Sequence, residues 1–148
     1  VQTVAAFTPQ HVLDLYCGIG NLTVPLAASG VDVTGVEREG QATSDLRVNA
    51  RQVQKNIQIV TEDVERFDPT REFFDVAVVD PPRAGAKGVL SRLCVVRPRA
   101  IVYVSCHLAS ALRDAKELPA DYRLREVRCF EMFPDTHHLE TVLVYVRE

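Results

Sequence analysis

The sequence predicts an α/β fold, with a mainly parallel seven-stranded sheet, helices on both faces and a C-terminal antiparallel hairpin. Short apolar runs alternate with helical segments along the chain, as in βαβ units. The runs 76–79 and 101–104 are apolar without alternation, which is typical of parallel strands covered on both faces. The last two apolar runs have only a loop between them, so these two strands must pair antiparallel or lie apart.

The expected elements follow from these periodicities. Strands are expected at residues 11–16, 32–37, 57–61, 74–80, 100–106, 122–133 and 141–146, and helices at 21–28, 41–53, 88–95 and 109–117. Asn21 is expected to cap the first helix, and Gly30 to end it in a left-handed conformation. Ala42 and Leu46 mark the apolar face of the second helix, and Pro119 stops the last one.

Length, composition and charge narrow the class of protein. With 148 residues, 47% of them hydrophobic and 25% charged, the chain fits a single globular domain over residues 1–148. It contains no apolar run near the roughly 20 residues that cross a bilayer, and its first residues lack signal-peptide features. We therefore expect a cytoplasmic protein without a membrane partner. The net charge is -3 and no Lys/Arg cluster is present, which predicts weak binding of nucleic acid by this chain alone.

The cysteines are too far apart in the sequence to form a C-x-x-C pair. Cys17, Cys94, Cys106 and Cys129 are therefore expected to be free thiols rather than ligands of a metal or a redox pair. The adjacent pair His137-His138 points to opposite faces of an extended segment, so we expect no metal site there either.

A glycine-containing turn follows the first expected strand, in the run Asp14-Leu-Tyr-Cys-Gly-Ile-Gly-Asn21. Gly18 and Gly20 allow the backbone to approach a ligand closely, and the helix N-terminus beyond them offers free N–H groups. Thr23 stands where the dinucleotide fingerprint has its third glycine. An acid just before the glycines, here Asp14, is typical of S-adenosylmethionine (SAM) sites. The alternative is a tight turn that binds no ligand.

Two further acids follow the next strands. Glu37 ends the second expected strand, where an acid accepts hydrogen bonds from ribose hydroxyls in such folds; NAD and SAM both carry that ribose. Asp63 follows the third strand, where an acid can accept from an adenine amino group. Alternatively, both are ordinary surface acids.

Candidate reactive residues follow the fourth and fifth strands. The prolines of Asp80-Pro81-Pro82-Arg83 fix the backbone and hold Asp80 at the carboxyl edge of the sheet, where ligands bind in open α/β folds. Cys106 ends the fifth strand at the same edge and is a candidate nucleophile, although a small buried thiol is the alternative.

Several motifs then occur in order along nearly the whole chain. They are the glycine turn 14–21, Gly35-Val-Glu37, Asn49-Ala50, Asp80-Pro-Pro-Arg83-Ala-Gly85, Val104-Ser-Cys106 with Arg113-Asp114, and Met132-Phe-Pro-Asp-Thr-His-His-Leu-Glu140. Together they resemble the SAM-dependent RNA (uracil-5-)-methyltransferases, which form 5-methyluridine in tRNA and rRNA. The resemblance implies a Rossmann-like class I methyltransferase fold, whose sheet ends in a hairpin, whereas dinucleotide dehydrogenases end with further βαβ units.

The resemblance also implies roles for individual residues. Cys106 would add to carbon 6 of a flipped uracil and Glu140 would remove the carbon-5 proton. Asp80 and Arg83 would orient the substrate and the methionine end of SAM. Other SAM contacts are implied for Tyr16 and Asn21, and join those expected for Gly18, Gly20, Glu37 and Asp63. Because a neutral thiol is a poor nucleophile, we expect Arg83 or the helix N-terminus after Cys106 to favour the thiolate.

The chain departs from the family pattern in two ways. His107-Leu108 follows Cys106 where relatives usually have Asn-Pro or Asp-Pro, which is expected to alter the substrate pocket or the activation of the cysteine. The RNA-binding domain, a Gln-bearing segment and an iron–sulfur box of some relatives are not in this sequence, so it looks like the catalytic domain alone. Three alternatives remain: a SAM-dependent methyltransferase for another substrate, an inert SAM-binding module, and an NAD-dependent oxidoreductase, which Thr23 and the hairpin disfavour.

Overall fold

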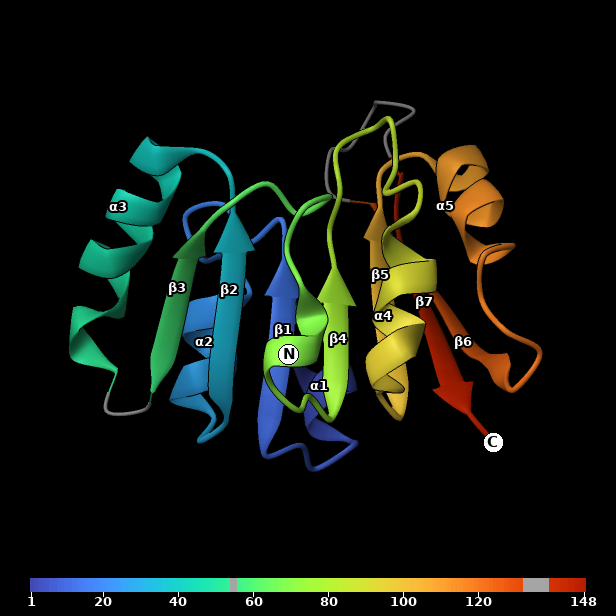
Figure 1. The fold of residues 1–148 in the computed structure, drawn as a ribbon, viewed down its shortest axis with the longest axis horizontal. Coiled ribbons are helices and arrows are strands. Elements are labelled where there is room, and N and C mark those ends of the chain that lie inside the picture. Colours follow the sequence, from blue (N-terminus) through green and yellow to red (C-terminus); the bar gives the residue numbers. More distant parts are fainter. Residues whose placement is uncertain (54–55, 132–138) are drawn as a thin grey trace.

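A seven-stranded sheet forms the centre of the protein (Figure 1). The computed structural model describes residues 1–53, 56–131 and 139–148. The strands are β1 (His11–Leu15), β2 (Asp32–Glu37), β3 (Ile57–Thr61), β4 (Val76–Val79), β5 (Ala100–Ser105), β6 (Tyr122–Glu131) and β7 (Leu139–Arg147), in the spatial order β3-β2-β1-β4-β5-β7-β6. The first five strands are parallel, and β7 runs antiparallel to both β5 and β6. The predicted parallel sheet with its antiparallel end is confirmed.

Helices cover both faces of this sheet. They are α1 (Gln2–Ala5), α2 (Thr23–Ala28), α3 (Gly40–Asn49), α4 (Val89–Val96) and α5 (Leu108–Ala115), with the 3-10 turns η1 (Ala50–Gln52) and η2 (Pro69–Arg71). Figure 1 shows α4 in front of the sheet and α1 and α2 behind it. Within the described residues, no helix combines the length and the apolar character needed to cross a membrane.

The core consists of two apolar clusters, one on each face of the sheet. Leu13, Ala77 and Ile101 point to the face covered by α4 and α5, whereas Val12, Val76 and Val102 point to the face covered by α1 and α2. All four residues of β4 are buried, because β4 lies between β1 and β5 with helices on both sides. This is the environment that its uninterrupted apolar run predicts.

Element boundaries differ from the sequence predictions at several points. Asn21 does not cap α2, which begins at Thr23 with Leu22 at its N-cap position and no side-chain cap hydrogen bond, because the turn after β1 continues through residues 21 and 22. The predicted helix 41–53 ends at Asn49 and continues as η1. Gly30 has the expected left-handed φ of 97°. The short helix α1 was not predicted, and residues 132–138 of the last motif lie outside the described residues.

Candidate active site

The carboxyl ends of β1, β2, β4 and β5 meet the start of β7 at one edge of the sheet, the upper edge in Figure 1. Two cavities open there, of about 520 and 470 Å³. Tyr16, Glu37 and Asp63 line the larger cavity, while Asn21 and Glu140 line the other. Asp80 lines both, so it stands where the two cavities meet.

The glycine turn after β1 is held by backbone geometry. Tyr16, Gly18 and Gly20 have positive φ values of 62°, 52° and 92°. A Cβ atom on Gly20 would lie 2.2 Å from Leu46 Cδ1, so this glycine also allows close packing against α3. The Asn49 side chain adds a tie from the end of α3, because its Nδ2 donates to the Ile19 carbonyl at 2.9 Å.

Asp14 is completely buried beneath this turn. Its Oδ2 accepts a hydrogen bond from Thr23 Oγ1 at 2.6 Å, while its buried Oδ1 accepts none from the described residues. Burial raises the pKa of Asp14 to about 7, with a smaller contribution from the nearby charge of Asp80 and against the effect of the Thr23 hydrogen bond. Asp14 also lines a small cavity of about 90 Å³ together with Asn21. A ligand cation in that cavity would satisfy the unpaired oxygen.

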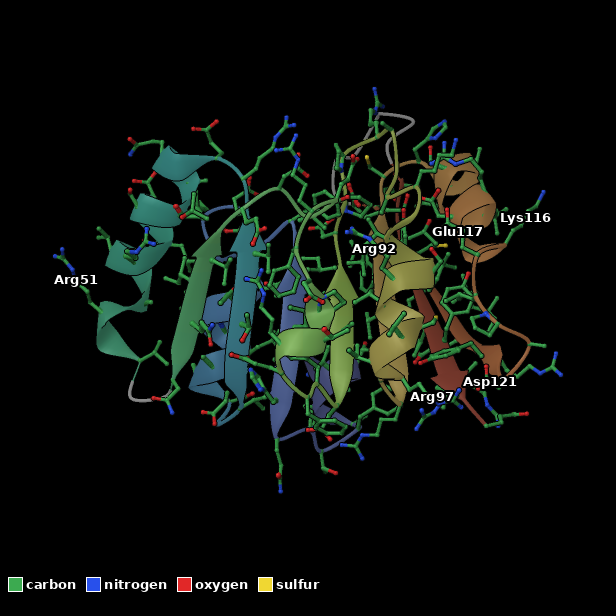
Figure 2. All side chains as sticks on the ribbon, viewed as in Figure 1. Arg51, Arg92, Arg97, Lys116, Glu117 and Asp121 are labelled. Carbon is green, nitrogen blue, oxygen red and sulfur yellow. The ribbon has the colours of Figure 1, made fainter. Side chains whose placement is uncertain are left out.

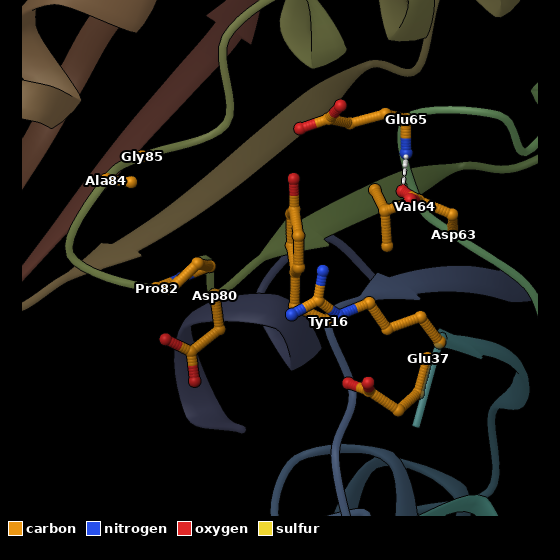
Figure 3. Close-up of a pocket in the computed structure, with 10 residues that line it drawn as sticks. Tyr16, Glu37, Asp63, Val64, Glu65, Asp80, Pro82, Ala84 and Gly85 are labelled. Carbon is orange, nitrogen blue, oxygen red and sulfur yellow. Dashed lines mark hydrogen bonds between the residues drawn. The ribbon is translucent and has the colours of Figure 1, made fainter. Parts of the chain in front are cut away.

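Glu37 and Asp63 lie on the far side of Tyr16 from Asp80 (Figure 3). Glu37 accepts from the Gly18 N–H at 3.2 Å and from the Glu39 N–H at 2.8 Å. Asp63 accepts from the Glu65 N–H at 2.9 Å. Carboxylate oxygens have two lone pairs each, so both side chains keep acceptor capacity for ligand hydroxyl or amino groups.

Tyr16 separates these two acids from Asp80 with an upright ring (Figure 3). Burial raises the pKa of Tyr16 to about 12, and the charges of Glu65 and Asp63 contribute in the same direction. The phenol is therefore neutral at physiological pH, and its ring offers a flat surface at the centre of the cavity.

Asp80 and Glu140 are electrostatically coupled across the second cavity. Partial burial raises the pKa of Asp80 to about 6, and the negative charge of Glu140 contributes to this shift. Arg83 is exposed on the loop after β4, where its carbonyl accepts a hydrogen bond from Ser110 Oγ at 2.8 Å. Of these loop residues, the structure brings Asp80 next to Glu140.

Cys106 and Glu140 lie next to each other at the end of the β5–β7 pair. Ser105 is the partner of Thr141 in this antiparallel ladder, so the next residue outward on β5 is Cys106 and on β7 is Glu140. Val104 and Glu140 line the second cavity, whereas Cys106 follows the last residue of β5 and is not among the residues that line this cavity. Cys106 is half-buried rather than enclosed in the core.

Sequence reasoning missed some features of this edge. The sequence marks Asp14 as typical of SAM sites but predicts no contact for it, and only its burial shows the unpaired oxygen. Phe130 lines the second cavity and is paired with Glu140 across β6 and β7, yet nothing in the sequence distinguishes it from other strand residues. All four cysteines are free, and the described ranges contain no group of three or more potential metal ligands. The pair His137-His138 lies outside those ranges.

Comparison with known proteins connects this site to a family. The tRNA (Uracil-5-)-methyltransferase family matches residues 2–148. The chain is 39% identical over 145 residues to the 23S rRNA (uracil(1939)-C(5))-methyltransferase RlmD of Yersinia enterocolitica, and 40% identical over 144 residues to that of Klebsiella pneumoniae. These alignments cover 94% and 93% of this chain but 33% of each relative, so the chain spans about a third of their length.

Comparison with solved structures points to the same family. The tRNA (uracil-54, C5)-methyltransferase of Pyrococcus abyssi, solved in complex with S-adenosyl-L-homocysteine, superimposes with a TM-score of 0.85 at 32% identity, over 98% of this chain and 38% of that one. The magnesium protoporphyrin IX methyltransferase ChlM of Synechocystis PCC 6803 has a TM-score of 0.78 at 17% identity, over 99% and 77% of the two chains, which supports the fold alone. The family match extends over nearly the whole sequence, and this chain therefore belongs to the tRNA (uracil-5-)-methyltransferase family.

Proposed function

We propose that this chain is the catalytic domain of an enzyme that transfers a methyl group from SAM to carbon 5 of a uridine in RNA. The observation that carries the proposal is the β5–β7 register, which brings Cys106 and Glu140 to the same end of this strand pair, where Glu140 and Asp80 line one cavity. A thiol, a general base and a ligand-binding edge are the parts that this chemistry needs. The names of the relatives, which act on uracil in rRNA and tRNA, support it.

The residues of the larger cavity and of the small cavity beside Asp14 fit SAM. The unpaired, buried Oδ1 of Asp14 suits a ligand ammonium group, and Gly18 leaves open space where a side chain would otherwise stand. Glu37 and Asp63 have acceptor capacity for ribose hydroxyls and an adenine amino group. SAM, when bound, supplies an electrophilic methyl group. We assign Tyr16, Asn21 and Asp80 to the walls of this site, as their positions around the cavities support. Gly20 is assigned to it as part of the glycine turn, where it has a positive φ of 92°.

The chain's own residues would activate the uracil. The Cys106 thiolate forms a bond to carbon 6, and the electron pair of the 5,6 double bond moves towards the ring carbonyl at carbon 4. The resulting enolate makes carbon 5 nucleophilic enough to accept the methyl group. Glu140 then removes the proton from carbon 5, the double bond re-forms, and Cys106 leaves as a thiolate. Arg83 and the N-terminus of α5, which begins two residues after Cys106, are the groups that would favour that thiolate.

RNA is the proposed partner, and this chain alone is expected to hold it weakly. Its net charge of -3 provides little attraction for phosphates. The target base must leave its stack to reach Cys106, as for other enzymes that modify a base. We expect this activity in the cytoplasm.

A short RNA that contains 5-fluorouridine tests the proposal. Fluorine on carbon 5 cannot be removed as a proton, so the covalent complex should accumulate after methyl transfer and survive denaturing electrophoresis. Cys106→Ala should abolish the complex, whereas Cys129→Ala, which changes an exposed cysteine on β6, should not. With ordinary uridine, Glu140→Gln should accumulate the methylated complex. SAM binding without any complex in the wild type would favour an inert SAM-binding module instead, and preferential NADH binding would exclude a methyltransferase.

A further inference from the structure

Helix α5 and the turn after it carry a polar stripe at positions 110, 113, 114 and 117. This is the i, i+3, i+4, i+7 spacing that apolar residues occupy on a core-facing helix side. Ser110 and Asp114 are nevertheless buried, and Asp114 is fully inaccessible to solvent. Buried polar side chains need hydrogen-bond partners, and here each of the two has a partner in the same loop.

The loop that supplies these partners is loop 80–88, the segment between β4 and α4 that contains Asp80 and Arg83. Each member of the stripe binds a main-chain group of this loop. Ser110 Oγ donates to the Arg83 carbonyl at 2.8 Å, and Arg113 Nη2 donates to the Ala84 carbonyl at 2.8 Å. The Asp114 carboxylate accepts from the Ala86 N–H at 2.6 Å, and that of Glu117 from the Gly88 N–H at 2.7 Å.

Asp114 is the centre of this arrangement. Its Oδ2 also accepts from the hydroxyl of Tyr103 at 2.8 Å, and its Oδ1 accepts from Nε and Nη2 of Arg113 at 2.9 and 2.6 Å. Tyr103 lies on β5, three residues before Cys106. One carboxylate therefore joins loop 80–88, helix α5 and the strand that leads to the candidate nucleophile. An amide in its place would lose acceptor capacity at one of the two atoms.

The residue after Cys106 is tied to the same loop. His107 Nδ1 and Ser110 Oγ are 2.7 Å apart. Because the only hydroxyl proton of Ser110 is donated to the Arg83 carbonyl, His107 Nδ1 must be the donor to Ser110. His107 and Ser110 therefore form a second connection between the end of β5 and the loop.

We propose that the polar stripe positions Asp80 and Arg83 relative to Cys106 for the covalent step, with Asp114 as the principal positioning residue. This inference rests on the proposed function. These four contacts of the stripe are made to main-chain atoms of the loop, so they fix where the loop lies. A misplacement of about 1 Å near reacting atoms can lower a rate about 100-fold.

The 5-fluorouridine RNA assay on the whole 148-residue chain tests this role, because it separates the rate constant of complex formation from its final amplitude. With saturating SAM and RNA, Asp114→Asn should lower the rate constant about 10- to 100-fold while the amplitude reaches that of the wild type. A purely structural role would lower the amplitude, through loss of folded enzyme, and leave the rate constant of the remainder unchanged. Lys116→Ala, at the exposed residue directly after α5 (Figure 2), should change neither.

Two milder variants cover the case in which Asp114→Asn does not fold. Tyr103→Phe removes one donor to Asp114 and keeps the ring in the core, and Ser110→Ala removes the tie to Arg83. Each should lower the rate constant several-fold without loss of amplitude. Wild-type rate constants in the folded variants would overturn the inference and leave the proposed function intact. If the wild type itself forms no complex, the proposed function fails and the inference fails with it.

Discussion

Two loops at the carboxyl edge of the sheet present ligand-binding groups, and they are held in different ways. The glycine turn after β1 takes its shape from positive φ values and from main-chain hydrogen bonds, such as that from the Gly20 N–H to the Cys17 carbonyl at 2.9 Å. Loop 80–88 after β4 contains a comparable turn, from the Gly85 N–H to the Pro82 carbonyl. Four other main-chain groups of this loop bind side chains of the α5 stripe, about thirty residues further along the chain.

The two loops therefore differ in which residues determine their shape. The glycine turn depends mainly on its own residues, and loop 80–88 depends on residues of α5. A turn whose residues supply their own geometry folds in much the same way wherever its strand and helix are present. Loop 80–88 depends on the buried carboxylate of Asp114, so it reaches its position only when helix α5 is packed against the sheet. The position of the loop therefore depends on the packing of the whole C-terminal half. This arrangement couples the loop to the strand that carries Cys106.

Among the variants that test this comparison, Gly85→Ala is expected to lose the most unfolding free energy. Gly85 has a φ of 84°, and a Cβ atom there would lie 2.4 Å from Asp114 Oδ2 and 2.5 Å from Arg113 Nη2. Backbone strain and displacement of buried groups together should cost about 2–4 kcal/mol of unfolding free energy, measured by urea denaturation. Gly30→Ala is the matched control, because Gly30 has a φ of 97° with open space around it, and should cost about 1 kcal/mol. If both variants lost the same unfolding free energy, the side chains of α5 would not restrict the space at position 85.

The same contrast between local and distant contacts explains which parts of the structure could be predicted from the sequence. The strands, their parallel order and the antiparallel end follow from short-range periodicity, and they are confirmed. The glycine turn follows largely from its own residues, although Glu37 and Asn49 also bind its main chain. The contacts of Asp114 depend on the approach of two segments 28 residues apart, and a sequence gives no sign of which buried polar group a helix side will meet. Ser110, Arg113, Asp114 and Glu117 at core-facing spacing were the available signal, since polar residues there require partners.

A second prediction concerns the glycine turn and pH. The pKa of Asp14 is about 7 in the folded protein, raised by burial above its ordinary value of 3.8. Folding therefore takes up a proton between about pH 4 and pH 7, so Asp14 makes the unfolding free energy fall as pH rises through that range. Asp14→Asn cannot ionise and should raise stability at pH 8 by about 1–2 kcal/mol relative to the wild type. Thermal denaturation at pH 5 and pH 8 measures this difference.

Ligand binding should show the opposite trend, because a ligand ammonium favours the ionised carboxylate. S-adenosylhomocysteine, a stable analogue of the proposed cofactor, should bind the wild type more tightly as pH rises from 6 to 8, and calorimetry should show a weaker dependence for Asp14→Asn. The variant is thus expected to be more stable and to bind less tightly. A variant with unchanged affinity at both pH values would remove Asp14 from the ligand site and leave its unpaired oxygen without a functional reason.

The site was only partly predictable for a related physical reason. Residues at strand ends, such as Glu37, Asp80 and Cys106, can be placed on one edge once the sheet is known, because parallel strands end together. The adjacency of Cys106 to Glu140 requires the register of β5 against β7, which side-chain periodicity does not fix. The unpaired oxygen of Asp14 likewise appears only when the packing around it is known.

The smallest effect is expected from Asn49→Ala, which removes the long-range tie between α3 and the glycine turn. Its Nδ2 donates to the Ile19 carbonyl at 2.9 Å from an exposed position, so water can replace the lost hydrogen bond. If the turn is held mainly by its own backbone, the variant should lose about 0.5 kcal/mol of stability and bind S-adenosylhomocysteine about twofold more weakly. Calorimetry measures this affinity for Asn49→Ala and for Ser110→Ala, which deletes the equivalent hydrogen bond at loop 80–88. A tenfold loss of affinity in Asn49→Ala would mean that the glycine turn also depends on a distant side chain, and that the two loops differ only in degree.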